Sequence, residues 1–246
     1  MQASTRERVR CLMFDRPQRR NAIGSQTVQD LERELDAAER DATIGAIILS
    51  GSPPAFCAGS DLKELGSLSI QGMCEHELKT ARVARLIAGM SKPVIAAVEG
   101  YALGGGFILA ASCDVVVTAG NARWHLPEVP NGWLPPWGLQ TLLARVGPVR
   151  ARLLTFGADP IDGHEALRLG VADYVAAAGA VDDVATSLAN RLATLPSPAV
   201  RSTKRFFEPY VSLDGERLDR VATEHFAANC SYASAQATLE KFKVRK

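Results

Sequence analysis

Two glycine-containing loops are the first segments of this chain that could do chemistry. They are residues 56–62 (FCAGSDL) and the run Gly104-Gly105-Gly106, and each follows a predicted buried strand at a similar offset. Small residues let the backbone approach a ligand closely. Free N–H groups at the start of a helix bind a negatively charged oxygen. A tight turn that requires glycine is the simpler explanation of either loop taken alone.

Glu128 is the candidate acid/base. It lies beside the apolar residues Leu126, Val129 and Pro130. Removal from water disfavours the charged form of a carboxyl group and raises its pKa, which suits proton transfer near neutral pH. The alternative is a surface or helix-capping carboxylate, the usual role of glutamate.

Several other kinds of site are disfavoured by the sequence. A G-x-G-x-x-G dinucleotide motif beginning at Gly104 would need glycine where Leu109 stands, and there is no P-loop sequence. The formal net charge of +1 gives no overall field that would attract a nucleic acid. The cysteines form no CxxC pair and have no histidine at metal-ligand spacing, so we expect reduced thiols and no metal site; they are Cys11, Cys57, Cys74, Cys113 and Cys230.

Aliphatic runs and helical periodicity predict the elements that position these loops. Strands are predicted at residues 9–14, 45–49, 93–98, 115–118 and 171–175. Helices are predicted at residues 26–40, 76–90, 104–111, 139–146, 149–156, 163–169, 181–195, 200–207 and about 213–228. The alternation indicates an α/β fold. Because strands thin out late in the chain, we divide it into a core of residues 1–190 and a helical C-terminal region of residues 191–246.

The composition is that of a soluble globular protein, with 47% hydrophobic and 22% charged residues. No apolar run approaches the roughly 20 residues that span a bilayer. The N-terminal segment lacks the apolar stretch of a signal peptide. We therefore expect a cytoplasmic protein.

Four motifs together resemble the crotonase (enoyl-CoA hydratase/isomerase) family. They follow one another at family-like spacing: residues 15–22 (DRPQRRNA), 55–62 (AFCAGSDL), 92–106 (KPVIAAVEGYALGGG) and 126–128 (LPE). The resemblance implies a spiral of β-β-α turns, followed by a helical region that assembles a trimer or a pair of trimers. It also implies an acyl-CoA thioester substrate and no metal or redox cofactor, since coenzyme A is part of the substrate.

The resemblance assigns the catalytic roles by motif position. The backbone amides of Ser60 and Gly105 would form the oxyanion hole for the thioester carbonyl, and Glu128 would move the proton. Preorganised amides stabilise an enolate oxygen, and losing one such donor typically costs roughly 3–4 kcal/mol. A nucleophilic Ser60 acting with His125 has no supporting motif and is a minor alternative.

The resemblance also places residues along the substrate. Arg19 or Arg20 would bind the CoA phosphates, although paired arginines are also common on solvated surfaces. The CoA tunnel would be lined by Ala22, Ala58, Asp61 and Leu62. Aromatic rings after Glu128 would bound the acyl pocket, with core packing as an equal alternative; they are Trp133 and Trp137. We expect His76 to be exposed, and the basic residues 241–246 to be solvated or to contact a CoA phosphate.

Ile108 departs from the family pattern. Hydratases of the family carry a second glutamate twenty positions before the first, where this chain has Ile108. A missing general acid or base typically costs roughly 10²–10⁴ in rate. We therefore expect an enoyl-CoA isomerase, in which one carboxylate moves a proton between C2 and C4. The alternatives are an enoyl-CoA hydratase, another crotonase-type lyase, a decarboxylase, a thioester hydrolase or, from a different class, a non-catalytic acyl-CoA-binding homologue.

Overall fold

Two parallel-stranded sheets form the centre of the fold. The computed structural model describes residues 1–157, 159–212 and 214–242. The larger sheet has the order β1-β2-β3-β5-β7-β9, and all its pairs are parallel except β1 with β2. Its strands are β1 (Gln2–Arg6), β2 (Val9–Phe14), β3 (Ala46–Gly51), β5 (Val94–Val98), β7 (Val115–Ala119) and β9 (Tyr174–Ala176).

The smaller sheet has the order β4-β6-β8 and is parallel. Its strands are β4 (Ala55–Cys57), β6 (Tyr101–Leu103) and β8 (Arg123–His125). Each follows a strand of the larger sheet, as β3–β4, β5–β6 and β7–β8, before the chain enters a helix. This repeated order confirms the α/β fold and the spiral of β-β-α turns.

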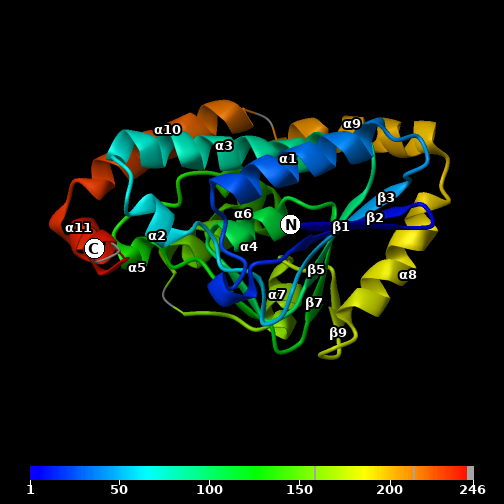
Figure 1. Cartoon of the computed structure of the whole chain (residues 1–246), viewed down its shortest axis with the longest axis horizontal. Coiled ribbons are helices and arrows are strands. Elements are labelled where there is room, and N and C mark those ends of the chain that lie inside the picture. The colour runs from blue at the N-terminus through cyan, green and yellow to red at the C-terminus, as the bar shows by residue number, and fades with distance from the viewer. Residues whose placement is uncertain (158, 213, 243–246) are drawn as a thin grey trace.

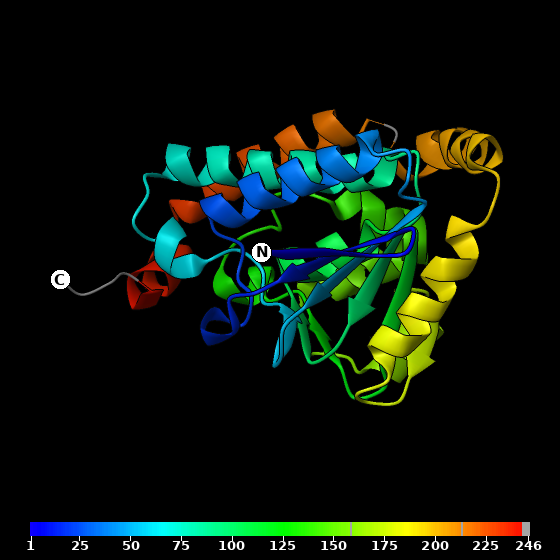
Figure 2. The same ribbon diagram turned by 45° about the vertical axis from the view of Figure 1, so that its right-hand side comes forward.

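Helices surround the sheets on several sides. They are α1 (Ser25–Arg40), α2 (Leu62–Leu65), α3 (Ile70–Gly89), α4 (Gly105–Ala111), α5 (Glu128–Asn131), α6 (Leu139–Phe156), α7 (Gly163–Leu169), α8 (Val181–Ala193), α9 (Ser197–Ser212), α10 (Gly215–Cys230) and α11 (Ala233–Phe242), with a 3₁₀ turn at Pro17–Arg19. Figure 1 shows α1, α3 and α10 along one side of the sheets. Figure 2 shows α8 along the larger sheet, where it contacts β3, β5 and β7.

The core follows the hydrophobic pattern. The central strands β3 and β5 are buried on both faces, which requires aliphatic side chains such as Ile47, Ile48 and Ile95. On α1, Leu31 and Leu35 are buried at helical spacing. The two sheets and α4 therefore rest on a continuous apolar core that holds the glycine loops in place.

The α3 helix begins at Ile70 rather than at residue 76. The reason is an N-cap, because the Ser69 hydroxyl accepts a hydrogen bond from Gly72 N–H at 3.1 Å.

Within the described ranges, no helix combines the length and apolar character needed to cross a bilayer.

Candidate active site

The loops at Ser60 and Gly105 lie against each other. They leave the same end of the smaller sheet, because β4 and β6 are parallel neighbours. A Cβ atom placed on Gly59 would lie 3.0 Å from the amide nitrogen of Gly105. Gly59 has φ +82° and Gly104 has φ +53°, a backbone region that favours glycine. The glycines therefore serve both a tight turn and close approach of the two loops.

The two predicted oxyanion-hole amides are unengaged in the described part of the chain. Asp61 N–H donates to Ile23 O at 2.9 Å, and Gly104 N–H donates to His125 O at 2.9 Å. The N–H groups of Ser60 and Gly105, each next to one of these bonded residues, have no backbone acceptor among the described residues. Gly105 is the first residue of α4, so its N–H has no acceptor within the helix. Both residues line the pocket that also contains Glu128.

Glu128 is buried against these loops, with 9% of the residue exposed. Its Oε1 would lie 2.7 Å from a Cβ atom on Gly104. Its Oε2 has no hydrogen-bond partner among the described residues. Burial raises the pKa of Glu128 to about 8, opposed by its own backbone amide and assisted by the negative charge of Glu77. This carboxyl group can therefore hold or release a proton near neutral pH.

Glu77 is a second carboxylate in the same pocket, and the sequence interpretation missed it. It is 2% exposed on α3. Its Oε1 accepts a hydrogen bond from Ser60 Oγ, and its Oε2 accepts one from Trp137 Nε1, each at 2.7 Å. Burial raises the pKa of Glu77, while the charge of His76 and the two hydrogen bonds oppose that rise. The missed signal was a glutamate at helical spacing from buried Met73.

His76, which we expected to be exposed, is buried. It is 5% exposed, and its Nε2 has no partner among the described residues. His76 lies at helical spacing from Met73, Thr80 and Val83, so it shares the buried face of α3. The expectation of an exposed histidine was therefore wrong.

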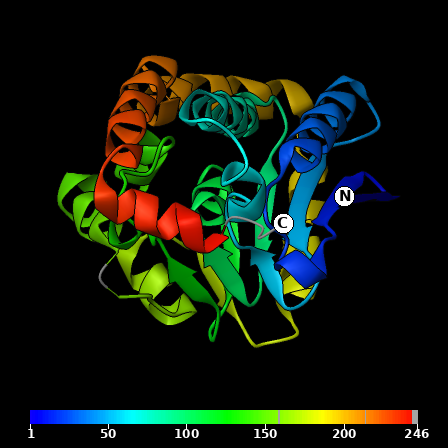
Figure 3. The same ribbon diagram turned by 60° about the vertical axis from the view of Figure 1, so that its left-hand side comes forward.

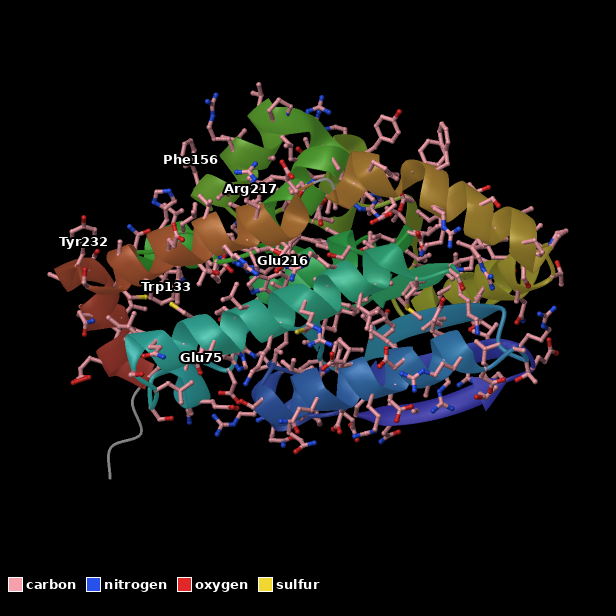
Figure 4. The ribbon with its side chains drawn as sticks, turned by 90° about the horizontal axis from the view of Figure 1, so that it is seen from above. Glu75, Trp133, Phe156, Glu216, Arg217 and Tyr232 are labelled. Carbon is pink, nitrogen blue, oxygen red and sulfur yellow. The ribbon has the colours of Figure 1, made fainter. Side chains whose placement is uncertain are left out.

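Apolar side chains complete the walls of the pocket, whose cavity measures about 60 Å³. Trp133 and Trp137 are 5% and 2% exposed and line it. Trp133 packs edge-to-face on Phe226 of α10, with ring centroids 6.1 Å apart. Figure 4 shows Trp133 beside the ends of α3 and α10. These rings therefore serve core packing and the pocket wall together, and their contact with an acyl group stays a prediction.

Helices from distant parts of the sequence close this end of the molecule. Figure 3 looks onto it and shows α11 crossing in front of the strand ends. The α11 helix contacts α2 and α5, and Leu239 of α11 lines the pocket with Leu65 of α2. The C-terminal region therefore takes part in the site.

Two of the predicted tunnel residues, Ala58 and Leu62, line the pocket. Asp61 has a structural contact instead, because its Oδ2 pairs with Arg16 Nη2 at 2.9 Å. Its Oδ1 also accepts from Lys63 N–H at the start of α2. Ala22 is buried next to this loop, and Arg16 Nη1 donates to its carbonyl oxygen at 2.8 Å.

The paired arginines lie next to the Ala58 loop and outside the pocket lining. Ala58 N–H donates to Arg20 O at 3.0 Å. Arg20 is exposed, and its guanidinium carbon lies 5.2 Å from the ring centroid of Tyr101. Arg19 is partly buried at the end of the 3₁₀ turn. Phosphate binding by either arginine stays a prediction, and residues 243–246 of the basic C-terminal segment lie outside the described residues.

Ile108 lies in the pocket wall, where the resemblance placed it. It is 1% exposed, and its side chain would collide with a Cβ atom on Gly138. A carboxylate is therefore missing from this position, and the second carboxylate of the pocket comes from α3.

Comparison with known proteins gives consistent matches. A sequence profile described as Enoyl-CoA hydratase/isomerase matches residues 4–246. A crotonyl-CoA hydratase of Syntrophomonas wolfei is 33% identical over 244 residues, covering 97% of this chain and 94% of its own. A short-chain-enoyl-CoA hydratase of Clostridium acetobutylicum is 34% identical over 200 residues, covering 80% of this chain and 77% of its own. A solved enoyl-CoA hydratase/isomerase from Mycobacterium paratuberculosis, 24% identical, covers 98% of this chain and 97% of its own with a TM-score of 0.89, a likeness of fold alone.

Proposed function

The chain belongs to the enoyl-CoA hydratase/isomerase family, and from this premise we propose that it hydrates short-chain 2-enoyl-CoA thioesters. Ile108 led us to expect an isomerase, but the similar curated proteins are named hydratases. We therefore favour hydration over isomerisation. The cavity of about 60 Å³ supports a short acyl chain. The reaction needs no metal or redox cofactor, because amides and carboxyl groups carry it.

The proposed reaction passes through a thioester enolate. The amides of Ser60 and Gly105 receive the thioester oxygen as it becomes negatively charged, and each such donor typically contributes roughly 3–4 kcal/mol. Water bonds to C3 and loses one proton to a base, and Glu128 delivers its own proton to C2 and is reprotonated at the end of the cycle. In the reverse direction Glu128 removes that proton.

The observation that carries the proposal is the state of Glu128. A carboxyl group with a pKa of about 8 is largely protonated at pH 7 and is therefore ready to act as the acid. Its Oε2, which has no hydrogen-bond partner in the ranges that the structure describes, is available to a substrate atom. The neighbouring amides of Ser60 and Gly105 hold the carbonyl of the same thioester.

The test is incubation of crotonyl-CoA with the wild type and Glu128→Gln, followed by mass spectrometry for the gain of water. We expect hydration by the wild type and a loss of roughly 10²–10⁴ in rate for the variant. Equal rates would contradict the role of Glu128. Binding of crotonyl-CoA without turnover would instead indicate the non-catalytic homologue.

Double-bond isomerisation is the second candidate, favoured by Ile108. A proton shift between C2 and C4 needs one carboxyl group and no activated water, so Glu128 alone suffices. The same assay with a 3-enoyl-CoA thioester separates the two, because isomerisation leaves the substrate mass unchanged.

The remaining proposals concern the setting of the enzyme. We propose that Arg19 or Arg20 binds the CoA phosphates and that the protein is cytoplasmic. We also propose a homotrimer or a pair of trimers. The support for assembly is the set of exposed apolar side chains on α6 and α9, including Leu153 and Phe206, each 66% exposed.

A further inference from the structure

Hydration needs a group that takes a proton from water, and Ile108 cannot do so. We propose that Glu77 of α3 is this group, a second catalytic carboxylate that acts as the base on the attacking water. The inference rests on the hydratase function proposed above. It assigns the two carboxyl groups of the pocket to different roles, with Glu128 as the acid.

Glu77 is positioned by two fixed donors. The Trp137 N–H can only donate, so Oε2 of Glu77 must accept, and Ser60 Oγ donates to Oε1 at 2.7 Å. Each carboxylate oxygen has a second lone pair, which leaves room for a water proton. Because Ser60 also supplies an oxyanion-hole amide, one residue fixes both the base and the thioester carbonyl.

The surroundings of the two carboxyl groups indicate which one is ionised and which one holds a proton. Among the described residues that line the pocket, none is a lysine or arginine. Two carboxylates in such a site repel each other, so the pair retains one proton near neutral pH. Two side-chain donors stabilise the ionised form of Glu77, whereas Oε2 of Glu128 has no partner within the described part of the chain. The charge therefore belongs on Glu77 and the proton on Glu128.

The proposed step balances as follows. The water oxygen forms a bond to C3 while one of its protons passes to Glu77. The C2–C3 π electrons move into the thioester, whose oxygen accepts from Ser60 and Gly105 N–H. The enolate then takes the proton of Glu128 at C2. One proton returns from Glu77 to Glu128 through water after the product leaves, so the net change is addition of one water.

This assignment predicts that Glu77 is needed for water addition and dispensable for proton exchange at C2. Three variants test it: Glu77→Gln, Glu128→Gln and the matched control Glu75→Gln on the exposed side of α3. The first assay is hydration of crotonyl-CoA. The second is exchange of the C2 protons of butyryl-CoA in deuterium oxide, which needs the enolate and Glu128 but adds no water.

We expect Glu77→Gln to hydrate roughly 10²–10⁴ times more slowly while its C2 exchange stays within about threefold of the wild type. Glu128→Gln should lose both activities, and Glu75→Gln neither. If Glu77→Gln does not fold, Ser60→Ala replaces it, since it removes one anchor of Glu77 and keeps the amide. That variant should lower hydration by about tenfold, the scale of one lost hydrogen bond, and by clearly more than it lowers exchange.

Three results would overturn the assignment. Hydration by Glu77→Gln, or by Ser60→Ala in its place, within about threefold of the wild type would show that Glu77 is not the base. Equal loss of hydration and exchange would show that Glu77 only supports the oxyanion hole. Failure of the wild type in both assays would refute the hydratase proposal itself, and the role of Glu77 would fall with it.

Discussion

The buried carboxyl group of Glu128 makes the stability of the protein depend on pH. Burial raises the folded-state pKa of Glu128 from 4.5 to about 8. Folded protein therefore holds a proton that unfolded protein releases between these values. The free energy of unfolding should fall as the pH rises from about 4.5 to about 8.

The Glu128→Gln variant removes this titration. We expect its free energy of unfolding to change less with pH over that window and to exceed that of the wild type at pH 8. The difference should be on the order of a few kcal/mol, since each pKa unit corresponds to about 1.4 kcal/mol. Urea unfolding at a series of pH values measures it, and parallel curves for the two proteins would contradict the raised pKa.

Gly104 offers a second test at single-residue scale. In Gly104→Ala the new Cβ would lie 2.7 Å from Glu128 Oε1, at a backbone φ of +53°. We expect the free energy of unfolding to fall by about 1–3 kcal/mol and most of the hydration activity to be lost. Gly89→Ala is the control, because its Cβ would meet no described residue within 4 Å. Thermal unfolding and the hydration rate compare them, and equal behaviour of the two variants would argue against the close contact.

At the scale of elements, the sequence predicted what is long and periodic. Strands β2 and β7 and helices α1 and α7 agree within about one residue with the predicted ranges. Strand β9 begins at Tyr174, later than expected. The missed strands include β4, β6 and β8, each three residues long, which is too short to show alternation. Yet these short strands carry the two oxyanion loops.

The residues of the candidate site were also predictable only where they lie in a recognisable motif. Ser60, Gly105 and Glu128 lie in recognisable motifs, and the structure brings them to one pocket. Glu77 lies in no motif, and its role depends on how α3 packs against the Ser60 loop and Trp137. Its contacts with Ser60 and Trp137 join three segments distant in sequence, and such contacts follow from tertiary packing rather than local pattern.

The contact between α3 and α10 is held by a buried acidic residue. Asp219 is 5% exposed, pairs with Arg85 of α3 and accepts a hydrogen bond from Gly138 N–H at 2.8 Å. Gly138 follows Trp137, which donates to Glu77. This element contact therefore supports the site indirectly.

We expect Asp219→Ala to lower the free energy of unfolding by about 1–3 kcal/mol, because a partly buried N–H and a cation lose their acceptor. Glu216→Ala, on the same helix, is the control. Glu216 lies at the surface (Figure 4) and pairs with Arg220. The free energy of unfolding of Glu216→Ala should therefore stay within about 0.5 kcal/mol of the wild type. Chemical denaturation measures both variants, and a similar effect for the two would show that the Asp219 contact contributes little.

At the scale of the whole molecule, α6 and α9 expose apolar surface. Val149, Leu153 and Phe156 of α6 are 67%, 66% and 54% exposed, and Figure 4 shows Phe156 at the edge of the molecule. Phe206 and Tyr210 of α9 are 66% and 71% exposed. Monomeric proteins rarely leave contiguous surface of this kind uncovered, so it supports the proposed assembly.

The sharpest test of that proposal is a charge placed on the α9 surface. Phe206→Asp removes an exposed ring and would bury a carboxylate in any interface formed there, so it should shift the protein from trimers or hexamers toward monomers. Gln29→Asp places the same charge on the polar face of α1 and should leave the mass unchanged. Light scattering during gel filtration measures both. A monomeric wild type, or a Phe206→Asp protein that keeps the wild-type mass, would mean that α9 does not hold the assembly together.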